Sequence, residues 1–445
     1  MTFKTSLGRF ALAAAIAASA LAASPAALAQ AREQFFPLLV YRTGAYAPNG
    51  TPWANGKQDY LKMINARDGG INGVKVTWEE CETGYATDRG VECYERLKSH
   101  PGVTYFEPQS TGITFALTDK APNDKIALLT PGYGLSVAQD GFAFPWNFPL
   151  MGSYWTAADI LVQHLAAKEG GIAKLKGKKI ALVYHDSPFG KEPIPLLQQL
   201  SKLDGFELQL IPVTAPGSEQ KAAWLQVRQS HPDYVFLWGW GIMNSTALKE
   251  AQATGYPRDR MYGVWWSGAE PDVKDVGMGA KGYNALALNP SGTSPRVIQD
   301  ILKYVYDKGQ GSGPRDDVGS VLYTRGVLIQ MLGVEAVRRA QERYGTGKVM
   351  TPVEVRWGFE NLALDQKKLD ALGFANVLRP ISTSCADHMG STWARIQTWD
   401  GAKWHMTSDF MQADESIIKP MVKAGADKYL AEKKLSRRTA ADCEL

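Results

Sequence analysis

Histidine and acidic side chains give this sequence few places at which covalent chemistry could occur. His185 and Asp186 lie side by side at the end of an apolar run, where a general base could sit, but no nucleophile accompanies them. The six His residues are scattered and lack the H-E-x-x-H spacing that holds zinc on a helix. The residue pattern therefore predicts no catalytic site and no metal.

The glycine-rich segment 277–282 satisfies the G-x-G-x-x-G pattern of dinucleotide-binding turns. It precedes the apolar run at 283–288, whereas a nucleotide-binding turn follows a strand and opens a helix. We interpret the segment as a turn. The sequence also lacks a phosphate loop of the form G-x-x-x-x-G-K and the nucleophile elbow G-x-S-x-G, so it predicts no cofactor and no enzyme.

The four cysteines fit two disulfides in an exported chain. Pairing between sequence neighbours joins Cys81 to Cys93 and Cys385 to Cys443. The first pair closes a short loop and stabilises by about 3 kcal/mol on a chain-entropy estimate, and the second ties the C-terminal tail to the body. A zinc site is the alternative, but the spacings contain no C-x-x-C pair.

Residues 1–29 have the pattern of a cleaved signal peptide. Lys4 and Arg9 precede an Ala- and Leu-rich stretch that ends in a small-x-small site at 27–29. We expect the mature chain to start at Gln30. No Cys stands at the cleavage point, so a lipid anchor there is not expected, and the protein is predicted to be free in the periplasm.

The length and charge of the mature chain restrict its class. About 415 residues are too many for one ordinary core and predict two domains or lobes. The formal charge of +4 falls to +2 once Lys4 and Arg9 are removed, so a basic footprint for nucleic acid is absent. No later segment is long and apolar enough to predict a membrane span.

Short apolar runs alternate with amphipathic stretches, the pattern of parallel sheets covered by helices. The strand candidates form two series, at 38–41, 74–78, 103–106 and 126–129, and at 180–184, 208–213, 234–237, 261–264 and 283–288. The helix candidates include 154–168, 193–203, 219–229, 245–254, 295–308 and 318–343. A β-hairpin is expected at 393–399 and 403–406, joined by Asp400-Gly401.

Proline-containing segments separate the two series of strands. Segment 142–152 is expected to cross between lobes, and the break at 289–292 is a second candidate crossing. Several crossings form a hinge that favours rigid-body closure around a central cleft. The expected organisation is a signal peptide at 1–29, a first lobe at 30–149 with 289–385, a second lobe at 150–288 with 386–415, and a C-terminal helical tail at 416–445.

Several segments together carry a resemblance to a known family. They are GAYAPNG at 44–50, INARDGGING at 64–73, PQST at 108–111, TPG at 130–132 and YHDSPFG at 184–190. In this order and spacing, the sequence resembles the periplasmic solute-binding proteins of ABC transporters, of the branched-chain amino-acid type, from about residue 38 to 409. The resemblance implies a type I periplasmic-binding fold, an α/β architecture of two doubly wound parallel-sheet lobes joined by three hinge crossings.

The resemblance also implies a clamp for the polar head of a ligand on the first lobe. Members of the family use a Ser or Thr after the third strand and backbone groups after the fourth. By this match the clamp comprises Ser110, Thr111, Gly132, Tyr133 and Gly134. Loops that lead from parallel strands into helices are also where N–H groups and hydroxyls hold anions. Helix capping by Ser110 is the structural alternative.

The second lobe departs from the family pattern. Amino-acid binders place a carboxylate after the strand at 261–264, where this chain has Trp265 and Trp266, and Trp240 follows the preceding strand. Aromatic faces favour stacking on a planar ligand, and a cage for a quaternary amine is also open. Strand alternation makes it improbable that both Trp265 and Trp266 face the cleft. Glu270 could replace the missing carboxylate, which keeps amino acids as an alternative.

Five further residues are candidates at the cleft. Arg42 follows the first strand and could meet a carboxylate with two hydrogen bonds. Tyr46 and Asn49 lie in the following loop, and Phe189 lies at the corresponding rim of the second lobe. Tyr323 matches a position where the family often brings a Tyr towards the ligand. Each of them could equally have a structural role.

The sequence therefore predicts a monomeric substrate-binding component of an ABC importer that delivers a small solute to permease membrane subunits. The Trp-rich loops indicate a carboxylate with an aromatic or otherwise apolar body. A branched-chain or other amino acid is the alternative ligand, and a periplasmic sensor of the same fold is the alternative role. A secreted hydrolase would need a nucleophile–base or metal constellation that the sequence lacks.

Overall fold

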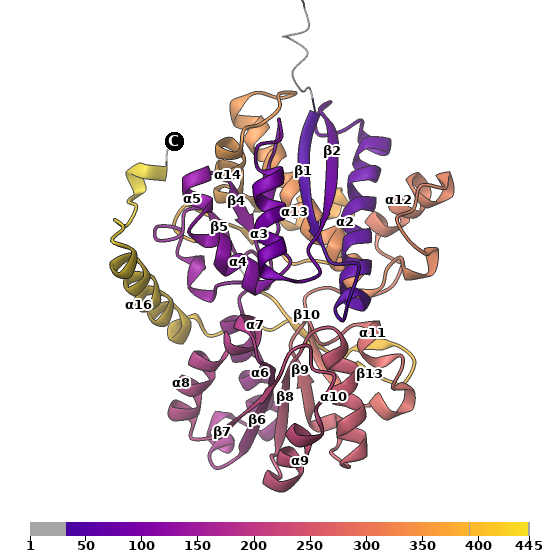
Figure 1. Ribbon diagram of the computed structural model, residues 1–445, viewed down its shortest axis with the longest axis vertical. Helices are drawn as coiled ribbons and strands as arrows, with labels where there is room; N and C mark the ends of the chain where they lie inside the picture. The colour runs from indigo at the N-terminus through magenta and orange to yellow at the C-terminus, as the bar shows by residue number, and fades with distance from the viewer. Residues whose placement is uncertain (1–32, 391, 444–445) are drawn as a thin grey trace, which may run out of the picture.

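The computed structural model describes residues 33–390 and 392–443 (Figure 1). The predicted signal peptide at 1–29 lies outside the described residues. Among the described helices, none combines the length and the apolar character that a bilayer crossing requires.

The first lobe is built on a parallel sheet. Its strands are β1 (Glu33–Val40), β2 (Lys75–Glu82), β3 (Tyr105–Phe106), β4 (Ala127–Leu129) and β5 (Asn147–Phe148). Strand β1 pairs with β2, and β3, β4 and β5 pair in order. A parallel bridge between Phe35 and Val103 joins the two groups, which gives the doubly wound order 2-1-3-4-5.

The second lobe contains a seven-stranded sheet with the order β14-β13-β10-β9-β8-β6-β7. Its strands are β6 (Lys179–His185), β7 (Glu207–Val213), β8 (Tyr234–Trp238), β9 (Met261–Gly263), β10 (Asn284–Ala287), β13 (Arg395–Trp399) and β14 (Trp404–Met406). Strands β6 to β10 are parallel to one another. The predicted hairpin β13–β14 pairs antiparallel with β10 through β13. The parallel part repeats the doubly wound order of the first lobe.

Helices cover both sheets (Figure 1). In the first lobe these are α2 (Ala47–Asp68), α3 (Thr87–Leu97), α4 (Thr111–Thr118), α5 (Ala121–Asp124), α12 (Arg296–Tyr304), α13 (Val321–Tyr344), α14 (Pro352–Glu360) and α15 (Gln366–Leu372). In the second lobe they are α6 (Tyr154–Glu169), α7 (Pro188–Lys191), α8 (Ile194–Asp204), α9 (Lys221–Ser230), α10 (Ile242–Ala253) and α11 (Glu270–Val273). Local sequence sets their ends: Ser153 caps the start of α6 in a capping box with Thr156, and Gly170 ends the helix at φ 92°.

Two glycines allow α2 and α13 to pack backbone against backbone. A Cβ at Gly56 would lie 2.0 Å from the Tyr323 carbonyl oxygen, and a Cβ at Gly326 would lie 2.1 Å from that of Trp53. Only glycine fits at contacts this close. The pair of glycines therefore fixes Trp53 and the neighbouring Arg325 in relation to each other at the cleft.

The chain passes between the two sheets three times, after β5, after β10, and between β12 (Ile381–Ser382) and β13. Strand β12 pairs with β11 (Ala363–Leu364) in a small antiparallel sheet. The expected architecture of two doubly wound lobes with three crossings is confirmed. We retain the lobe boundaries at 149–150, 288–289 and 385–386 as a proposal.

The C-terminal tail lies along the side of the first lobe, and its helix starts near the second lobe (Figure 1). Helix α16 (Glu415–Lys433) starts beside α6, where the Asp414 N–H donates to Asp159 Oδ2 at 2.7 Å. Its last turns pack on the first lobe: the Tyr429 ring lies 4.4 Å from that of Phe144, and the Tyr429 hydroxyl donates to Asp119. The tail helix therefore contacts both lobes.

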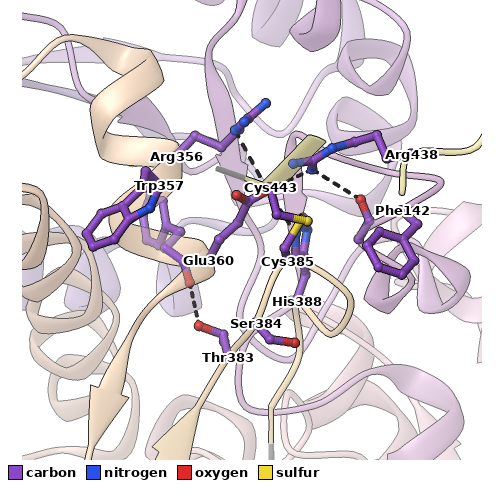
Figure 2. A network of polar contacts seen from close by, with 12 residues as sticks. Phe142, Arg356, Trp357, Glu360, Thr383, Ser384, Cys385, His388, Arg438 and Cys443 are labelled. Carbon is purple, nitrogen blue, oxygen red and sulfur yellow. Dashed lines mark hydrogen bonds and ion pairs between the residues drawn. A yellow bond between two sulfur atoms is a disulfide. The ribbon is translucent and has the colours of Figure 1, made fainter. Parts of the chain in front are cut away.

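The end of the tail is fastened to the first lobe (Figure 2). Both predicted disulfides are confirmed, and Cys443 bonds to Cys385 just after β12. Beside this tail disulfide, the Arg438 guanidinium donates to the buried Glu360 carboxylate at 2.7 Å, and the Arg438 N–H donates to the Phe142 carbonyl. A covalent bond and an ion pair thus hold the segment after α16 in place.

Candidate functional site

A narrow cavity of about 20 Å³ lies between the lobes, where the carboxyl ends of the strands of both sheets face each other. Eight aromatic residues and three polar ones line it: Tyr41, Trp53, Tyr85, Tyr133, Tyr154, Phe189, Trp240, Trp266, Gln109, Ser110 and Thr111. Ligand sites of doubly wound folds lie at this edge of the sheet. In this closed arrangement the space holds about one water molecule, so an organic ligand requires the lobes or the lining side chains to move apart.

The polar end of the cavity is the start of α4. Ser110 is the N-cap of this helix, and its hydroxyl accepts from the Ile113 N–H at 3.4 Å. The Thr111 hydroxyl contacts the Tyr154 hydroxyl at 3.4 Å and accepts from the Gly134 N–H. A helix N-terminus with hydroxyl groups beside it favours negative charge. The capping role and a binding role of Ser110 are therefore compatible.

Indole rings form the apolar wall. Trp53 from α2 and Trp266 from the loop after β9 stack with their ring centroids 4.7 Å apart and an angle of 14°. Trp240, from the loop after β8, meets both of them edge to face, at 6.1 and 5.6 Å. The stacked pair joins residues from opposite lobes, so this wall is complete only when the lobes are closed.

Two donors that line the cavity have no acceptor among the described residues: the Tyr41 hydroxyl and the Trp240 Nε1–H. Both side chains are buried, and burial raises the pKa of Tyr41 well above 10, so the hydroxyl keeps its proton. An unpaired buried donor costs free energy. A ligand with acceptor atoms would satisfy both groups.

A buried ion pair lies beneath the cavity. Lys57 Nζ is 2.7 Å from Glu107 Oε2, and the Tyr133 hydroxyl donates to Glu107 Oε1 at 3.0 Å. Burial raises the pKa of Glu107, which Lys57 opposes. Gln109, oriented to satisfy its neighbours, accepts from Lys57 and from the Trp53 indole. Lys57 and Glu107 neutralise each other. The Tyr133 hydroxyl donates its proton to Glu107, so it is not available as a donor to a ligand.

Trp265 and Trp266 of the second lobe contact Gly132 of the first lobe, and all three residues were predicted to bind the ligand. Both indole Nε1–H groups donate to the Gly132 carbonyl oxygen, at 2.7 and 3.0 Å. Trp266 lines the cavity, whereas Trp265 does not. The carbonyl of Gly132 therefore fastens the second lobe to the first, and its N–H donates to the Leu150 carbonyl at 3.1 Å.

Other predicted candidates lie outside the cavity. Arg42 makes two hydrogen bonds to the Glu80 carboxylate, at 2.6 and 2.8 Å, and a third to Asn55. The Tyr323 hydroxyl donates to Asp59 at 2.7 Å, between α2 and α13. Arg42 and Tyr323 therefore bind carboxylates of the protein itself and not a ligand in the cavity. Gly134 also lies outside the lining and contacts Thr111.

Tyr46 and Asn49 make contacts between the lobes. The Tyr46 hydroxyl lies 2.8 Å from His185 Nε2, and Asn49 donates to the buried Asp272 at 3.0 Å. Burial lowers the pKa of His185 to about 4 and raises that of Asp272 to about 7. These side chains stabilise the closed arrangement rather than line the cavity.

Two partly buried acids of the second lobe accept backbone hydrogen bonds from the first. Glu192 accepts from the Ser136 N–H at 2.6 Å, and Glu270 accepts from the Val321 N–H at 3.0 Å. Burial raises the pKa of Glu192 to about 7 and raises that of Glu270. Glu270 thus binds the start of α13, and no Asp or Glu is among the residues that line the cavity.

Sequence reasoning missed five lining residues: Tyr41, Trp53, Tyr85, Gln109 and Tyr154. Tyr41 directly follows β1, and Gln109 lies between β3 and α4, so position after a strand was an available signal. Trp53 and Tyr154 are helical residues with the pattern of core positions. Within the described ranges, no group of three or more His, Cys, Asp or Glu side chains could hold a metal ion.

Comparisons with known proteins agree on one family. Residues 33–403 match the family model described as periplasmic binding protein. A structure described as an ABC transporter permease from the Pseudomonas fluorescens group is 41% identical, with a TM-score of 0.85, over 92% of this chain and 99% of that one. A search among curated proteins found no match.

Two more distant structures share the fold. A branched-chain amino-acid ABC transporter protein from Thermus thermophilus with bound valine is 20% identical, with a TM-score of 0.73, over 88% of this chain and 99% of that one. A solute-binding protein of an ABC transporter from R. palustris in complex with benzoate is 16% identical, with a TM-score of 0.67, over 86% and 98%. The fold of this chain is therefore that of type I periplasmic-binding proteins.

Proposed function

The chain belongs to the periplasmic binding protein family, as a substrate-binding protein of an ABC transporter and not an enzyme, and from this premise we propose that its ligand is a small aromatic carboxylic acid. The observation that carries the proposal is the lining of the cavity, which has eight aromatic side chains and no carboxylate. Such a lining fits an apolar, planar body with an acidic head.

The head group is assigned to the start of α4. The hydroxyls of Ser110 and Thr111 and the N-terminal amides of the helix form a neutral donor set, and the helix dipole adds a favourable field. The unpaired donors of Tyr41 and Trp240 can take further acceptor atoms of the ligand. Hydrogen bonds from neutral donors to a carboxylate are charge-assisted and therefore strong.

The body of the ligand is assigned to the aromatic wall. Trp53, Trp266 and Trp240 present faces and edges to the same cavity. Each aromatic contact with a planar ligand contributes about 0.5–1.5 kcal/mol beyond the burial of area. An aliphatic body would gain the burial of area without this term.

An amino acid would lack a partner for its ammonium group. The substitute carboxylate proposed from sequence, Glu270, is bound to the Val321 N–H and does not line the cavity. Burial of an unpaired ammonium is costly. The related structures with valine and with benzoate indicate that the fold accommodates either kind of ligand. The choice between an amino acid and an aromatic acid therefore depends on the residues that line the cavity.

We further propose that the mature protein acts as a monomer in the periplasm and presents its closed form to the permease. The bridging contacts described above, among them those of Tyr46, Asn49 and Gly132, exist only in the closed arrangement. A ligand that completes the cavity would shift the population towards this form.

Isothermal titration with benzoate, 3,4-dihydroxybenzoate, leucine and 4-methylpentanoate tests the proposal, together with mass spectrometry of ligand released from purified protein. We expect the aromatic acids to bind tightest. Tight binding of leucine with no response to either aromatic acid would refute it. Ser110→Ala and Ser153→Ala form a matched pair, because both remove a helix cap at a cost of about 1 kcal/mol, but only the first should weaken binding.

A further inference from the structure

Arg325 is a buried cation without a counterion, close to the cavity but outside its lining. It lies in α13 with no exposed surface, and its Nη1 and Nη2 atoms have no acceptor among the described residues. Its Nε–H donates to Asn289 Oδ1, in the segment after β10. The guanidinium carbon lies 4.9 Å from the ring of Trp266, which does line the cavity.

The surrounding contacts hold this side chain in place. Gly326 packs against the Trp53 backbone, which fixes the turn of α13 that carries Arg325. The Asn289 amide donates to the carbonyls of Val321 and Pro290, so its oxygen is aimed at Arg325. The guanidinium therefore cannot turn to solvent without disturbing the crossing between the lobes.

The other charged groups nearby already have hydrogen-bond or ion-pair partners. Lys57 pairs with Glu107, Glu270 accepts from the start of α13, and Asp272 accepts from Asn49 and Asn244. Burial alone lowers the pKa of Arg325 to about 9, so it stays charged at neutral pH. Among these charged groups, Arg325 is the one whose Nη1 and Nη2 donors have no acceptor among the described residues, and an unsatisfied buried charge is costly.

We propose that Arg325 is a specificity-determining residue that selects ligands with a net negative charge. It acts as a fixed positive charge behind Trp266 and attracts the ligand carboxylate at the start of α4 across the cavity. Acids without an amino group are favoured, whereas neutral amides gain nothing and zwitterions bring an ammonium that Arg325 repels. This inference rests on the proposed function and narrows its ligand class to monoanions.

The test compares charged and neutral ligands of the same shape. Dissociation constants of benzoate and benzamide, and of 4-methylpentanoate and leucine, are measured for the full chain and for Arg325→Met and Arg325→Lys. Arg339→Met is the matched control, because this residue lies on the same helix but is exposed and paired with Glu342. Attraction between unit charges about 12 Å apart, at an effective dielectric constant of about 20, corresponds to about tenfold in affinity.

We expect Arg325→Met to weaken benzoate binding about tenfold and to leave benzamide unchanged, with Arg325→Lys and Arg339→Met close to the wild type. A preference for benzoate that survives in Arg325→Met overturns the inference but leaves the proposed function intact. If 4-methylpentanoate binds best and depends on Arg325, the inference holds and the aromatic body is wrong. If benzamide or leucine binds best in the wild type, both fail.

Thermal unfolding of the ligand-free variants provides a readout that does not depend on the ligand. Removal of a buried charge that has no counterion relieves its desolvation cost, which offsets the loss of the hydrogen bond to Asn289. We expect the melting temperature of Arg325→Met to equal or exceed that of the wild type. A clearly lower melting temperature would show that Arg325 is a structural residue and would overturn the inference.

Discussion

Removal of a single hydroxyl should separate ligand affinity from protein stability. Tyr41 lines the cavity and its hydroxyl has no acceptor among the described residues, so Tyr41→Phe breaks no hydrogen bond of the ligand-free protein. If the ligand carboxylate accepts from this hydroxyl, the variant loses a charge-assisted hydrogen bond of about 1.5–3 kcal/mol. Affinity should then fall by about tenfold to a hundredfold, with no loss of stability.

The control for this prediction is another buried tyrosine. The Tyr323 hydroxyl donates to Asp59 outside the cavity, so Tyr323→Phe should cost about 1–3 kcal/mol of stability and leave affinity unchanged. Isothermal titration with the tightest ligand of the panel and thermal unfolding without ligand measure the two quantities. A dissociation constant of Tyr41→Phe within twofold of the wild type would refute the assignment of the cavity donors. Equal weakening by Tyr323→Phe would refute the placement of the site.

Three more outcomes follow from the structure. Gly326→Ala places a Cβ 2.1 Å from the Trp53 carbonyl oxygen, so it should destabilise by about 1–3 kcal/mol in chemical denaturation and also weaken binding. Burial in the closed form raises the pKa of Glu192 and of Asp272 to about 7, raises that of Glu270, and lowers that of His185 to about 4, and we expect the shifts to relax when the lobes open. Near pH 5.5, ligand binding that closes the lobes should make the acids take up protons and the histidine release one. Isothermal titrations in buffers of different ionisation enthalpy should therefore show a net uptake of about one proton or more, and affinity should fall as pH rises towards 7. Net release of protons on binding would contradict this. Replacement of both cysteines of the tail disulfide by serine should cost about 4 kcal/mol on a chain-entropy estimate for a 58-residue separation, measured by thermal unfolding, and an unchanged melting temperature would contradict it.

The sequence predicted the architecture well because parallel sheets have a strong local signature. Apolar runs such as those that became β6 and β8 are bounded by turns and amphipathic helices, and this pattern survives without knowledge of tertiary contacts. Both cysteine pairs followed from their position along the chain. The resemblance then fixed how the lobes connect.

The cavity was only half accessible to such reasoning. Ser110, Trp240 and Trp266 follow strands and line the cavity, whereas Trp53 looked like an ordinary core residue of a helix. A ring buried by its own lobe and a ring buried by the opposite lobe have the same sequence pattern. Arg42 shows the opposite error, since it was predicted to bind the ligand but does not line the cavity. Its charge and position suggested a ligand carboxylate, but its guanidinium binds the Glu80 carboxylate.

The fastened C-terminal tail bears on how far the two halves can separate. Its helix begins at Glu415, beside Asp159 of one half, and Cys443 near its end is bonded to Cys385 of the other. A brace of this kind removes widely splayed arrangements from the ligand-free ensemble, so less disorder must be given up when the halves come together. We therefore expect a smaller interlobe opening and faster closure on the ligand. Reduction of the Cys385–Cys443 disulfide should widen the opening.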